Sequence, residues 1–193
     1  MVEQDPARTY RLAPQEHRRA VLLTVSHVRP DLVACWVFRL DAAGRPEILL
    51  IRRSGGRIYA GIWQCVTGRL EGDERVVDGA LREVREETGL DRADIDDVFE
   101  TDIINWFHEP SVDAVWCEAV FAARVRPDAT IRLSHEHDDL RWLTPDAARE
   151  LVVWPAYEQA IGMVEWLVAH PAKAGHYRLL DSPPPSPEEP SRQ

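Results

Sequence analysis

Cysteine and long apolar runs are both scarce in this chain of 193 residues. The three cysteines, Cys35, Cys65 and Cys117, are far apart and form no C-x-x-C pair. Such a set predicts neither a disulfide framework nor a zinc site, and it is typical of free thiols in a reducing compartment. No segment approaches the roughly 18 consecutive apolar residues of a membrane-spanning helix. The N-terminal residues also lack the apolar core of a signal peptide. We therefore expect a cytoplasmic protein with no membrane partner.

Positive charge is also in short supply. The chain carries 23 Lys and Arg against 33 Asp and Glu, a formal net charge of −10. Extended binding to a nucleic-acid backbone depends on Lys and Arg, so nucleic acid is not an expected partner. An acidic protein still binds an anionic substrate when divalent cations lie between the two. The composition, 45% hydrophobic and 29% charged, is that of a globular domain.

The apolar pattern predicts strands, then a helix, then further strands and helices. Runs rich in β-branched and aromatic residues come first, at 20–28, 32–40, 47–52 and 63–67. A helical pattern occupies 73–89, and the elements predicted after it are strands at 113–126 and 139–143 and helices from 145 and over 155–169. This order predicts an α/β fold with a mixed sheet covered on both faces.

The pattern also predicts where the helices begin and end. Asp73 is the expected N-cap of the first helix, and Gly89 is its expected C-terminal stop. Thr144 is the expected N-cap of the next helix, with Pro145 in its first position. Residues 91–102 carry six acids and one Arg, which favours an exposed connection leading into a strand.

The two ends of the chain differ in composition from the rest. Residues 1–19 are polar and mixed in charge, which indicates a loose arm or a short edge element. Residues 181–193 are rich in Pro and Ser, and they have too little apolar content to fold, so we expect a disordered tail. One domain is predicted between these ends, over residues 20–170.

A cluster of acids lies on the first predicted helix. At roughly 100° per residue, Glu83, Glu86 and Glu87 fall on one face, beside an apolar stripe that includes Ala80 and Val84. Neighbouring carboxylates repel one another. A hard cation such as Mg²⁺ relieves that repulsion because it prefers oxygen ligands. The alternative is a solvated helix face with ordinary i,i+4 ion pairs.

The spacing of residues 68–90 favours the first of these readings. It resembles the signature of the Nudix hydrolases, G-x5-E-x7-R-E-U-x-E-E-x-G-U, in which U is a bulky aliphatic residue. The matching positions are Gly68, Glu74, Arg82, Glu83, Val84, Glu86, Glu87, Gly89 and Leu90. The resemblance implies the Nudix fold, an α/β/α sandwich with a mixed β-sheet. It also implies hydrolysis of a nucleoside diphosphate linked to another moiety.

The same resemblance implies a role for each polar residue of the signature. The expected ligands of Mg²⁺ or Mn²⁺ are the side chains of Glu83, Glu86 and Glu87, with the carbonyl of Gly68 as a further ligand. Arg82 would orient the glutamates, and Glu74 would hold the start of the helix and the preceding loop. Bound divalent ions neutralise phosphate oxygens and lower the pKa of a bound water.

A general base is expected outside the helix, in the segment 134–143. Glu136 is the leading candidate, with Asp138 and Asp139 as rivals. In the dihydroneopterin triphosphate pyrophosphatase branch of the family, a similar Glu-His pair precedes the end of a strand. This chain resembles that branch over residues 32–168. A base within the helix, at Glu86, is the remaining alternative.

Candidates for substrate contact are aromatic and basic residues near the signature. The side chains that are candidates to stack on a base or pterin are those of Trp63, Trp106, Phe107 and Trp116, and Arg52 or Arg53 is the candidate for phosphate. Strand alternation lets only one of the two arginines face the site. Ordinary core tryptophans and surface arginines are the alternatives. Residues 105–108 lack the Pro of ADP-ribose hydrolases and the Tyr of diadenosine polyphosphate hydrolases.

The leading functional hypothesis is metal-dependent cleavage of a nucleoside or pterin triphosphate to a monophosphate and pyrophosphate. One alternative is a hydrolase of nucleotide sugars or nucleoside diphosphates, and another is a catalytically silent nucleotide sensor. Silent relatives usually lose glutamates of the signature, and this chain keeps all of them. The expected partner is a small nucleotide-like substrate, and a homodimer is one assembly that the sequence allows.

Overall fold

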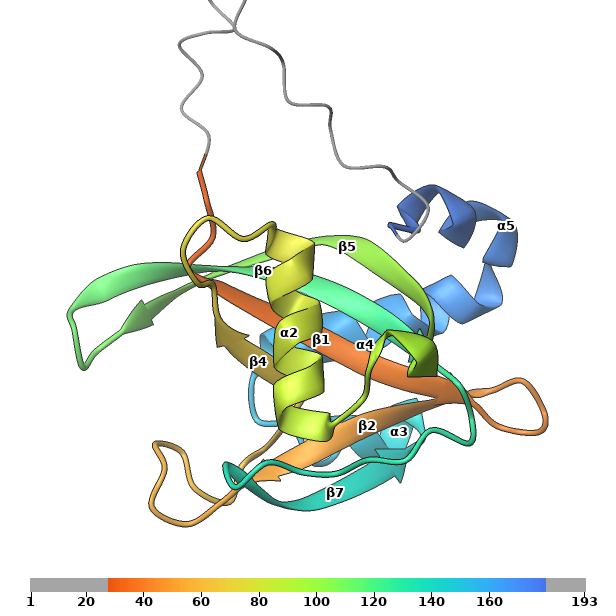
Figure 1. The fold of residues 1–193 in the computed structure, drawn as a ribbon, viewed down its shortest axis with the longest axis horizontal. Helices are drawn as coiled ribbons and strands as arrows, with labels where there is room; N and C mark the ends of the chain where they lie inside the picture. Colours follow the sequence, from red (N-terminus) through yellow and green to blue (C-terminus); the bar gives the residue numbers. More distant parts are fainter. Residues whose placement is uncertain (1–27, 180–193) are drawn as a thin grey trace, which may run out of the picture.

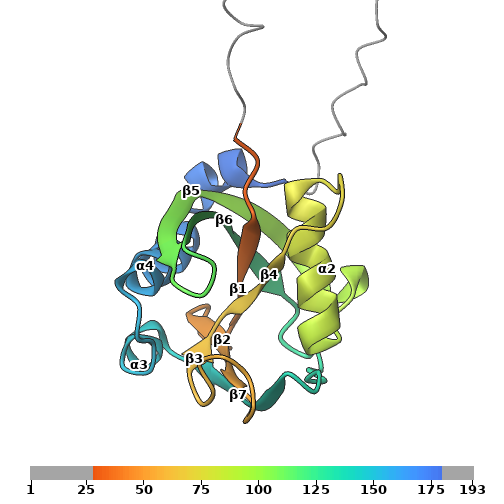
Figure 2. The same cartoon turned by 90° about the vertical axis from the view of Figure 1, so that its left-hand side faces the viewer.

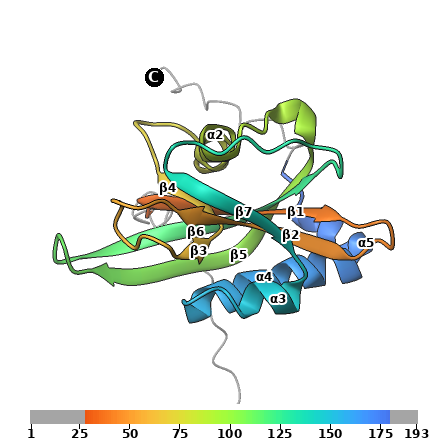
Figure 3. The same ribbon diagram turned by 90° about the horizontal axis from the view of Figure 1, so that it is seen from below.

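The structure, a computed structural model, describes residues 28–179. A central sheet is covered by helix α2 (Val76–Thr88) on one face and by α3 (Pro145–Arg149) and α4 (Pro155–Ala169) on the other. Figures 2 and 3 show the three layers from two directions. The expected α/β/α sandwich is therefore confirmed. The predicted arm 1–19, the tail 181–193 and all of the predicted strand 20–28 except Val28 lie outside the described residues.

The sheet is mixed, as the sequence predicts. Its strands are β1 (Leu32–Leu40), β2 (Pro46–Arg53), β3 (Trp63–Gln64), β4 (Val66–Arg69), β5 (Ile95–Glu109), β6 (Ala114–Val125) and β7 (His137–Leu143). The order is β3-β2-β1-β6-β5, with β4 also paired to β1 and β7 to β2. Strands β1 and β6 are parallel, and the other pairs are antiparallel. The end of the β5–β6 hairpin projects beyond the neighbouring strands (Figure 1).

Alternation along the strands divides the interior into two apolar clusters. On β1, Trp36 and Phe38 belong to the cluster under α4, whereas Val33 and Val37 belong to the cluster under α2. Two short elements, α5 (Pro171–Ala174) and the 3-10 turn η2 (Gly175–Tyr177), follow α4. Each large aliphatic or aromatic side chain buried in this way stabilises the fold by about 1.5–3 kcal/mol.

The first helix begins later in the chain than the sequence predicts. The N-cap is Arg75, with extended backbone and no capping side chain, instead of Asp73. The carbonyls of Gly72 and Glu74 accept hydrogen bonds from Arg29. These contacts hold the loop open until Val76. The predicted stop at Gly89 is confirmed, because Gly89 has a left-handed φ of 71° and its N–H donates to the Arg85 carbonyl.

The acidic segment 91–102 is a strand over most of its length, not an exposed connection. A single 3-10 turn, η1 (Arg92–Asp94), precedes β5, which begins at Ile95. Asp97 is buried in β5, where Arg124 and Arg178 form ion pairs with it. The prediction failed because these arginines, which compensate the charge of Asp97, come from other parts of the chain.

Two other predictions need smaller changes. The predicted strand 63–67 is divided at Cys65 into β3 and β4, and β4 continues past Gly68 to Arg69. The cap at Thr144 is confirmed, since its side chain accepts from the Ala147 N–H and Pro145 opens α3.

Candidate active site

Strand β4 and helix α2 are in tight contact at Gly68. A Cβ added to Gly68 would overlap the carboxylate of Glu83. A Cβ on Gly79 would lie 2.5 Å from Leu70 Cδ2 and 2.9 Å from Glu74 Oε1. A side chain at either position would have to displace these neighbouring groups. The backbone of β4 therefore lies directly against a glutamate of the helix.

Arg82 joins the acids of the signature to one another. Its guanidinium donates to both carboxylate oxygens of Glu74, at 3.0 and 3.2 Å. Its Nη1 donates to Glu83 Oε1 at 2.8 Å and to Glu86 Oε2 at 3.1 Å, and its Nη2 donates to the carbonyl oxygen of Arg69 at 2.8 Å. The hydrogen bond with Glu74 is the main reason that the pKa of Arg82 is raised above its usual value. These contacts are those of a residue that orients its neighbours.

Glu87 is the most deeply buried acid of the helix. Its side chain lies at 6% exposure, and its Oε2 has no hydrogen-bond partner among the described residues. Burial raises the pKa of Glu87 to about 8, and the charge of Glu83 adds to that effect, whereas a hydrogen bond from the Thr67 backbone opposes it. Burial also raises the pKa of Glu83. A buried carboxylate without a full set of partners is costly, so this position needs a proton or a cation.

The last turn of α2 fixes the course of the loop that carries Glu136. The Arg132 N–H donates to the Thr88 carbonyl at 2.7 Å, and the Ser134 N–H donates to the Glu87 carbonyl at 3.0 Å. A Cβ on Gly89 would lie 3.2 Å from Arg132 Cβ, so a larger residue would crowd this contact. The loop therefore runs along the carboxyl end of the helix.

Glu136 lies close enough to Glu87 for its charge to contribute to the raised pKa of Glu87. Its carboxylate forms a 2.9 Å ion pair with Arg57, and its carbonyl accepts from the Ser54 N–H at 2.9 Å. Arg57 Nη2 also lies 3.0 Å from His135 Nε2. The loop between β2 and β3 is thus fastened to the loop of the candidate base.

Sequence reasoning missed Arg57 and His137. Arg57 lies in a Gly-rich loop, and no local pattern connects it with Glu136. His137 is 5% exposed, and neither ring nitrogen has a partner among the described residues. Burial, followed by the charge of Arg53, lowers the pKa of His137 to about 4. A neutral imidazole therefore lies beside the candidate base.

The donor set of the helix suits a hard divalent cation. Glu87 offers a buried oxygen with no partner, the Glu83 carboxylate packs on Gly68, and Glu86 lies half exposed beside them. Within residues 28–179, no group of three Asp, Glu, His or Cys side chains forms a ready metal cage. Arg82 holds Glu83 and Glu86 instead, and its charge compensates theirs. The oxygen donors fit Mg²⁺ or Mn²⁺ and offer no soft ligand.

The two candidate arginines face opposite sides of the sheet, as alternation requires. Arg52 forms an ion pair with Asp138 at 2.7 Å and lies over the ring of Trp63, away from the glutamates of α2. Arg53 is the one near the site, because its charge acts on Glu87. Trp63 is 9% exposed and belongs to the core under α4.

Trp106 lies on the projecting hairpin, at 57% exposure. Strand pairing places it opposite Cys117, whereas Phe107 lies opposite Trp116 on the other face. The structure therefore gathers the glutamates, Glu136 and Arg53, and it leaves Arg52, Trp63 and Trp106 apart from them. The substrate roles of these three residues stay predictions that the geometry does not favour.

One further buried acid, Glu118, was also missed. It is 7% exposed, and Asn105 Nδ2 donates to its Oε2 at 2.8 Å. Burial raises the pKa of Glu118. A lone glutamate in an apolar strand gives no motif, so only the fold reveals its position.

The fold and the site together define a class: an α/β/α sandwich with a carboxylate cluster on one helix, packed against a glycine of the sheet. Comparison with known families makes this specific. The NUDIX domain family matches residues 30–167. The chain therefore belongs to the NUDIX family. Among the described residues, no helix has the length and apolar character to span a membrane.

Individual relatives match over shorter stretches or at lower identity. An octanoyltransferase of Myxococcus xanthus is 35% identical over 120 residues, which is 60% of this chain and 31% of that protein. An RNA pyrophosphohydrolase of Gluconacetobacter diazotrophicus is 45% identical over 58 residues, 28% of this chain and 34% of that protein. The chain thus spans about a third of the length of these curated relatives.

A solved structure supports the fold assignment. The dihydroneopterin triphosphate pyrophosphohydrolase of E. coli superposes with a TM-score of 0.60 at 24% identity, covering 72% of this chain and 96% of that one. At this identity the likeness shows a shared fold.

Proposed function

We propose that this chain is a metal-dependent pyrophosphohydrolase that cleaves a nucleoside or pterin triphosphate to a monophosphate and pyrophosphate. The observation that carries the proposal is the buried carboxylate of Glu87, which has one oxygen without a partner and lies beside Glu83 and Gly68. The names of two relatives, an RNA pyrophosphohydrolase and a dihydroneopterin triphosphate pyrophosphohydrolase, support a phosphoanhydride substrate.

The residues of the signature would hold Mg²⁺ or Mn²⁺ through the carboxylates of Glu83, Glu86 and Glu87 and the carbonyl of Gly68. When bound, the cation neutralises phosphate oxygens and makes an attacking water more acidic. Arg82 keeps the glutamates in position through its hydrogen bonds to Glu83 and Glu86. A side chain at position 68 would overlap the carboxylate of Glu83, so the glycine lets that carboxylate lie against β4.

Glu136 is proposed to accept the proton of the attacking water. The ligand glutamates have their lone pairs committed to a cation, whereas Glu136 lies on a loop next to them. Arg57 positions its carboxylate through the 2.9 Å ion pair. Arg53, on the same side of the sheet as Glu87, is the proposed contact for a phosphate oxygen. The neutral ring of His137 adds no competing positive charge beside the base.

The proposal is tested by measuring pyrophosphate and orthophosphate release from a panel of nucleotides and dihydroneopterin triphosphate with Mg²⁺. We expect pyrophosphate from triphosphates. Orthophosphate from nucleoside diphosphates, or turnover of nucleotide sugars, would identify the alternative hydrolase. Binding without any turnover would identify a silent nucleotide sensor.

The base is tested with Glu136→Gln. A general base contributes about 10²–10⁴-fold, so kcat should fall by that factor while Mg²⁺ binding changes little. The rise of the rate with pH should also flatten. Asp139→Asn is the matched control, because Asp139 lies on the same segment, and its carboxylate accepts from the Leu140 N–H at 2.9 Å and lies 3.9 Å from Arg52. A wild-type profile for Glu136→Gln, together with loss of the pH dependence in Glu86→Gln, would place the base on the helix.

A further inference from the structure

Four side-chain positions form a row across the face of the sheet that α4 covers only in part. Strand register pairs Asn105 with Glu118, Glu118 with Leu32, and Leu32 with Arg69. Paired residues point to the same face. The row therefore crosses β5, β6, β1 and β4 in order. It ends at Arg69, one residue after Gly68, against which the Glu83 carboxylate lies.

Glu118 is the unexpected member of this row. It is 7% exposed, and no described cation forms an ion pair with it. Among residues 28–179, Asn105 Nδ2 is the hydrogen-bond partner of this carboxylate, at Oε2, which leaves Oε1 facing solvent. After burial, the charge of Glu118 is the next cause of the raised pKa of Cys65. A carboxylate that is buried with one neutral partner costs stability, so a role in binding explains its presence better than packing does.

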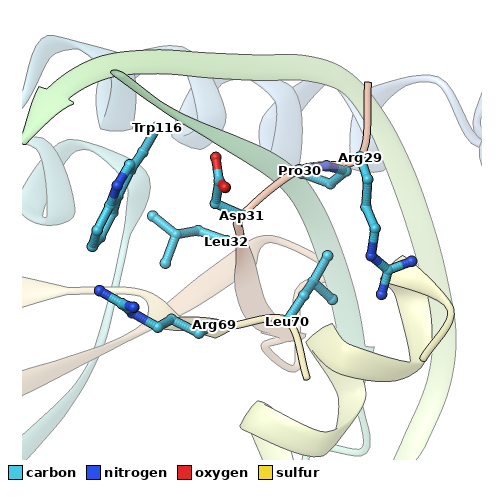
Figure 4. A pocket seen from close by; sticks show the side chains of 7 residues that line it. All are labelled: Arg29, Pro30, Asp31, Leu32, Arg69, Leu70 and Trp116. Carbon is cyan, nitrogen blue, oxygen red and sulfur yellow. The ribbon is translucent and has the colours of Figure 1, made fainter. Parts of the chain in front are cut away.

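An aromatic side chain and a cavity lie along the same row of residues. Trp116 is two residues before Glu118 on β6 and therefore shares its face, with Phe107 edge-on at 6.2 Å between ring centroids. The guanidinium of Arg69 lies over the Trp116 ring at 4.4 Å. A cavity of about 470 Å³ opens beside Trp116, and it is lined by Arg29, Pro30, Asp31, Leu32, Arg69, Leu70 and Trp116. It shares Leu32 and Arg69 with the row, and Glu118 lies at the next position of the row, outside this lining. Figure 4 shows Trp116, Leu32 and Arg69 around it.

The distance between Glu118 and the signature glutamates suits one extended substrate. Arg69 and Glu118 lie two strands apart, roughly 10 Å at the usual spacing between strands. Gly68 is the neighbour of Arg69 and faces Glu83 on the other side of the sheet. A substrate with its ring at Glu118 would therefore pass around β4 to bring its phosphate chain to the glutamates on the other face.

We propose that Glu118 selects the substrate ring by accepting hydrogen bonds from two adjacent N–H donors, the ring N–H and the exocyclic amino group of a 2-amino-4-oxopyrimidine. Guanine and pterin share this edge. An ionised carboxylate only accepts hydrogen bonds, and it has four lone-pair directions, of which Asn105 uses one. The inference rests on the proposed function, since it names the ring carried by the phosphoanhydride substrate.

Other rings fit this carboxylate less well. Adenine places a ring acceptor beside its amino group, and that acceptor would face a carboxylate oxygen. Hypoxanthine keeps the ring N–H of guanine and lacks the amino group. A site built around a hydrogen bond rejects an analogue without it more strongly than an apolar pocket rejects a missing methylene. Comparing guanine with hypoxanthine therefore isolates one of the two predicted bonds.

The experiment measures kcat/KM of the full chain with Mg²⁺ for GTP, ITP, ATP and dihydroneopterin triphosphate. Wild type should favour GTP over ITP by about 10-fold or more. Glu118→Gln replaces one acceptor by a donor and should lower kcat/KM for GTP by about 10–100-fold, with less than about threefold change for ATP. Comparing GTP with dihydroneopterin triphosphate distinguishes the two sources of the shared edge. Glu100→Gln, an exposed acid on β5, is the control.

Binding of GMP, IMP and AMP to the metal-free protein, measured by calorimetry, separates ring selection from catalysis. GMP should bind more tightly than IMP in wild type, and Glu118→Gln should remove that preference while its melting temperature stays near that of Glu100→Gln. Preference for GMP without hydrolysis of any triphosphate would overturn the proposed function and support the ring site. Equal values for GTP and ITP, or an equal loss on all substrates in Glu118→Gln, would overturn the ring site alone. If Glu118→Gln fails to fold, the GMP-to-IMP ratio of wild type still decides.

Discussion

The two faces of the central sheet are covered by helices of opposite character. Helix α4 places Tyr157, Ile161, Val164 and Leu167 on the sheet, and its buried residues are otherwise apolar. Helix α2 packs Ala80 and Val84 in the same way, but it also buries a carboxylate. The part of the sheet that α4 covers is therefore organised for stability. The α2 face gives up part of that stability to hold oxygen ligands close together, and this difference marks it as the functional face.

The largest effect expected from breaking this contrast is on activity. Glu83→Gln and Glu87→Gln each remove an anionic ligand worth several kcal/mol, so kcat should fall by about 10³-fold or more. Circular dichroism and melting curves should show an intact fold, because both changes keep the side-chain shape. Near-normal turnover of both variants at saturating Mg²⁺ would show that the ligands are elsewhere.

The matching change on the other face should affect stability alone. Ile161→Ala opens a cavity in a fully buried position of α4 and should cost about 2–5 kcal/mol in the free energy of unfolding. Denaturant titration measures this cost. Below the new melting point, kcat should stay at its wild-type value. Val153→Ala, at a position 59% exposed, is the control and should change stability by less than about 0.5 kcal/mol.

The buried carboxylate of α2 predicts a pH-dependent response to Mg²⁺. The folded-state pKa of Glu87 is raised from 4.5 to about 8. Without metal, its contribution to stability is full below the lower pKa and is lost as the pH rises through the higher one. A cation that replaces the proton restores that loss. The gain in Tm from Mg²⁺ should therefore be roughly 5 °C larger at pH 8.5 than at pH 6, since 1 kcal/mol corresponds to roughly 2–4 °C for a domain of this size.

Differential scanning calorimetry with chelator and with Mg²⁺ measures this difference. Glu87→Gln carries no charge at either pH and should respond to Mg²⁺ equally at both. A gain that is the same at pH 6 and pH 8.5 in wild type would contradict the assignment of Glu87 as the titrating ligand.

The smallest expected effect concerns the end of α2. Gly89→Ala forces a side chain into a left-handed φ of 71° near Arg132 and should cost about 1–2 kcal/mol. Because the loop to Glu136 is attached here, kcat should fall as well. Gly175→Ala is the control, since its φ is −56° and nothing lies within 4 Å of the added Cβ. It should leave both stability and kcat near wild type.

The sequence predicted the parts of the site that depend on local spacing. Gly68, Arg82 and the three glutamates lie within one continuous strand end, loop and helix, so their contacts follow from the signature and helical geometry. The fold followed in the same way from alternation along the strands. The start of α2 was placed too early because Arg29, far away in the chain, holds the preceding loop.

The parts that were missed depend on pairing between distant elements. The register of β2 decides that Arg53, and not Arg52, faces Glu87. The contact of Arg57 with Glu136 joins two loops, and the row from Asn105 to Arg69 crosses four strands. No spacing pattern in the sequence predicts any of these contacts. The role of Glu136 stays a prediction until the variant is measured.

The hydrogen bonds of Arg82 have a consequence for regulation by metal supply. One guanidinium already satisfies Glu74, Glu83 and Glu86 without a cation. The scaffold therefore keeps its shape when divalent ions are withdrawn, unlike a small zinc domain that unfolds with its metal. If the proposed metal dependence holds, depletion of the ion would stop activity while the fold stays intact, and activity would return with the ion. Arg82 acts as a permanent counterion, and it would keep the metal-free form folded.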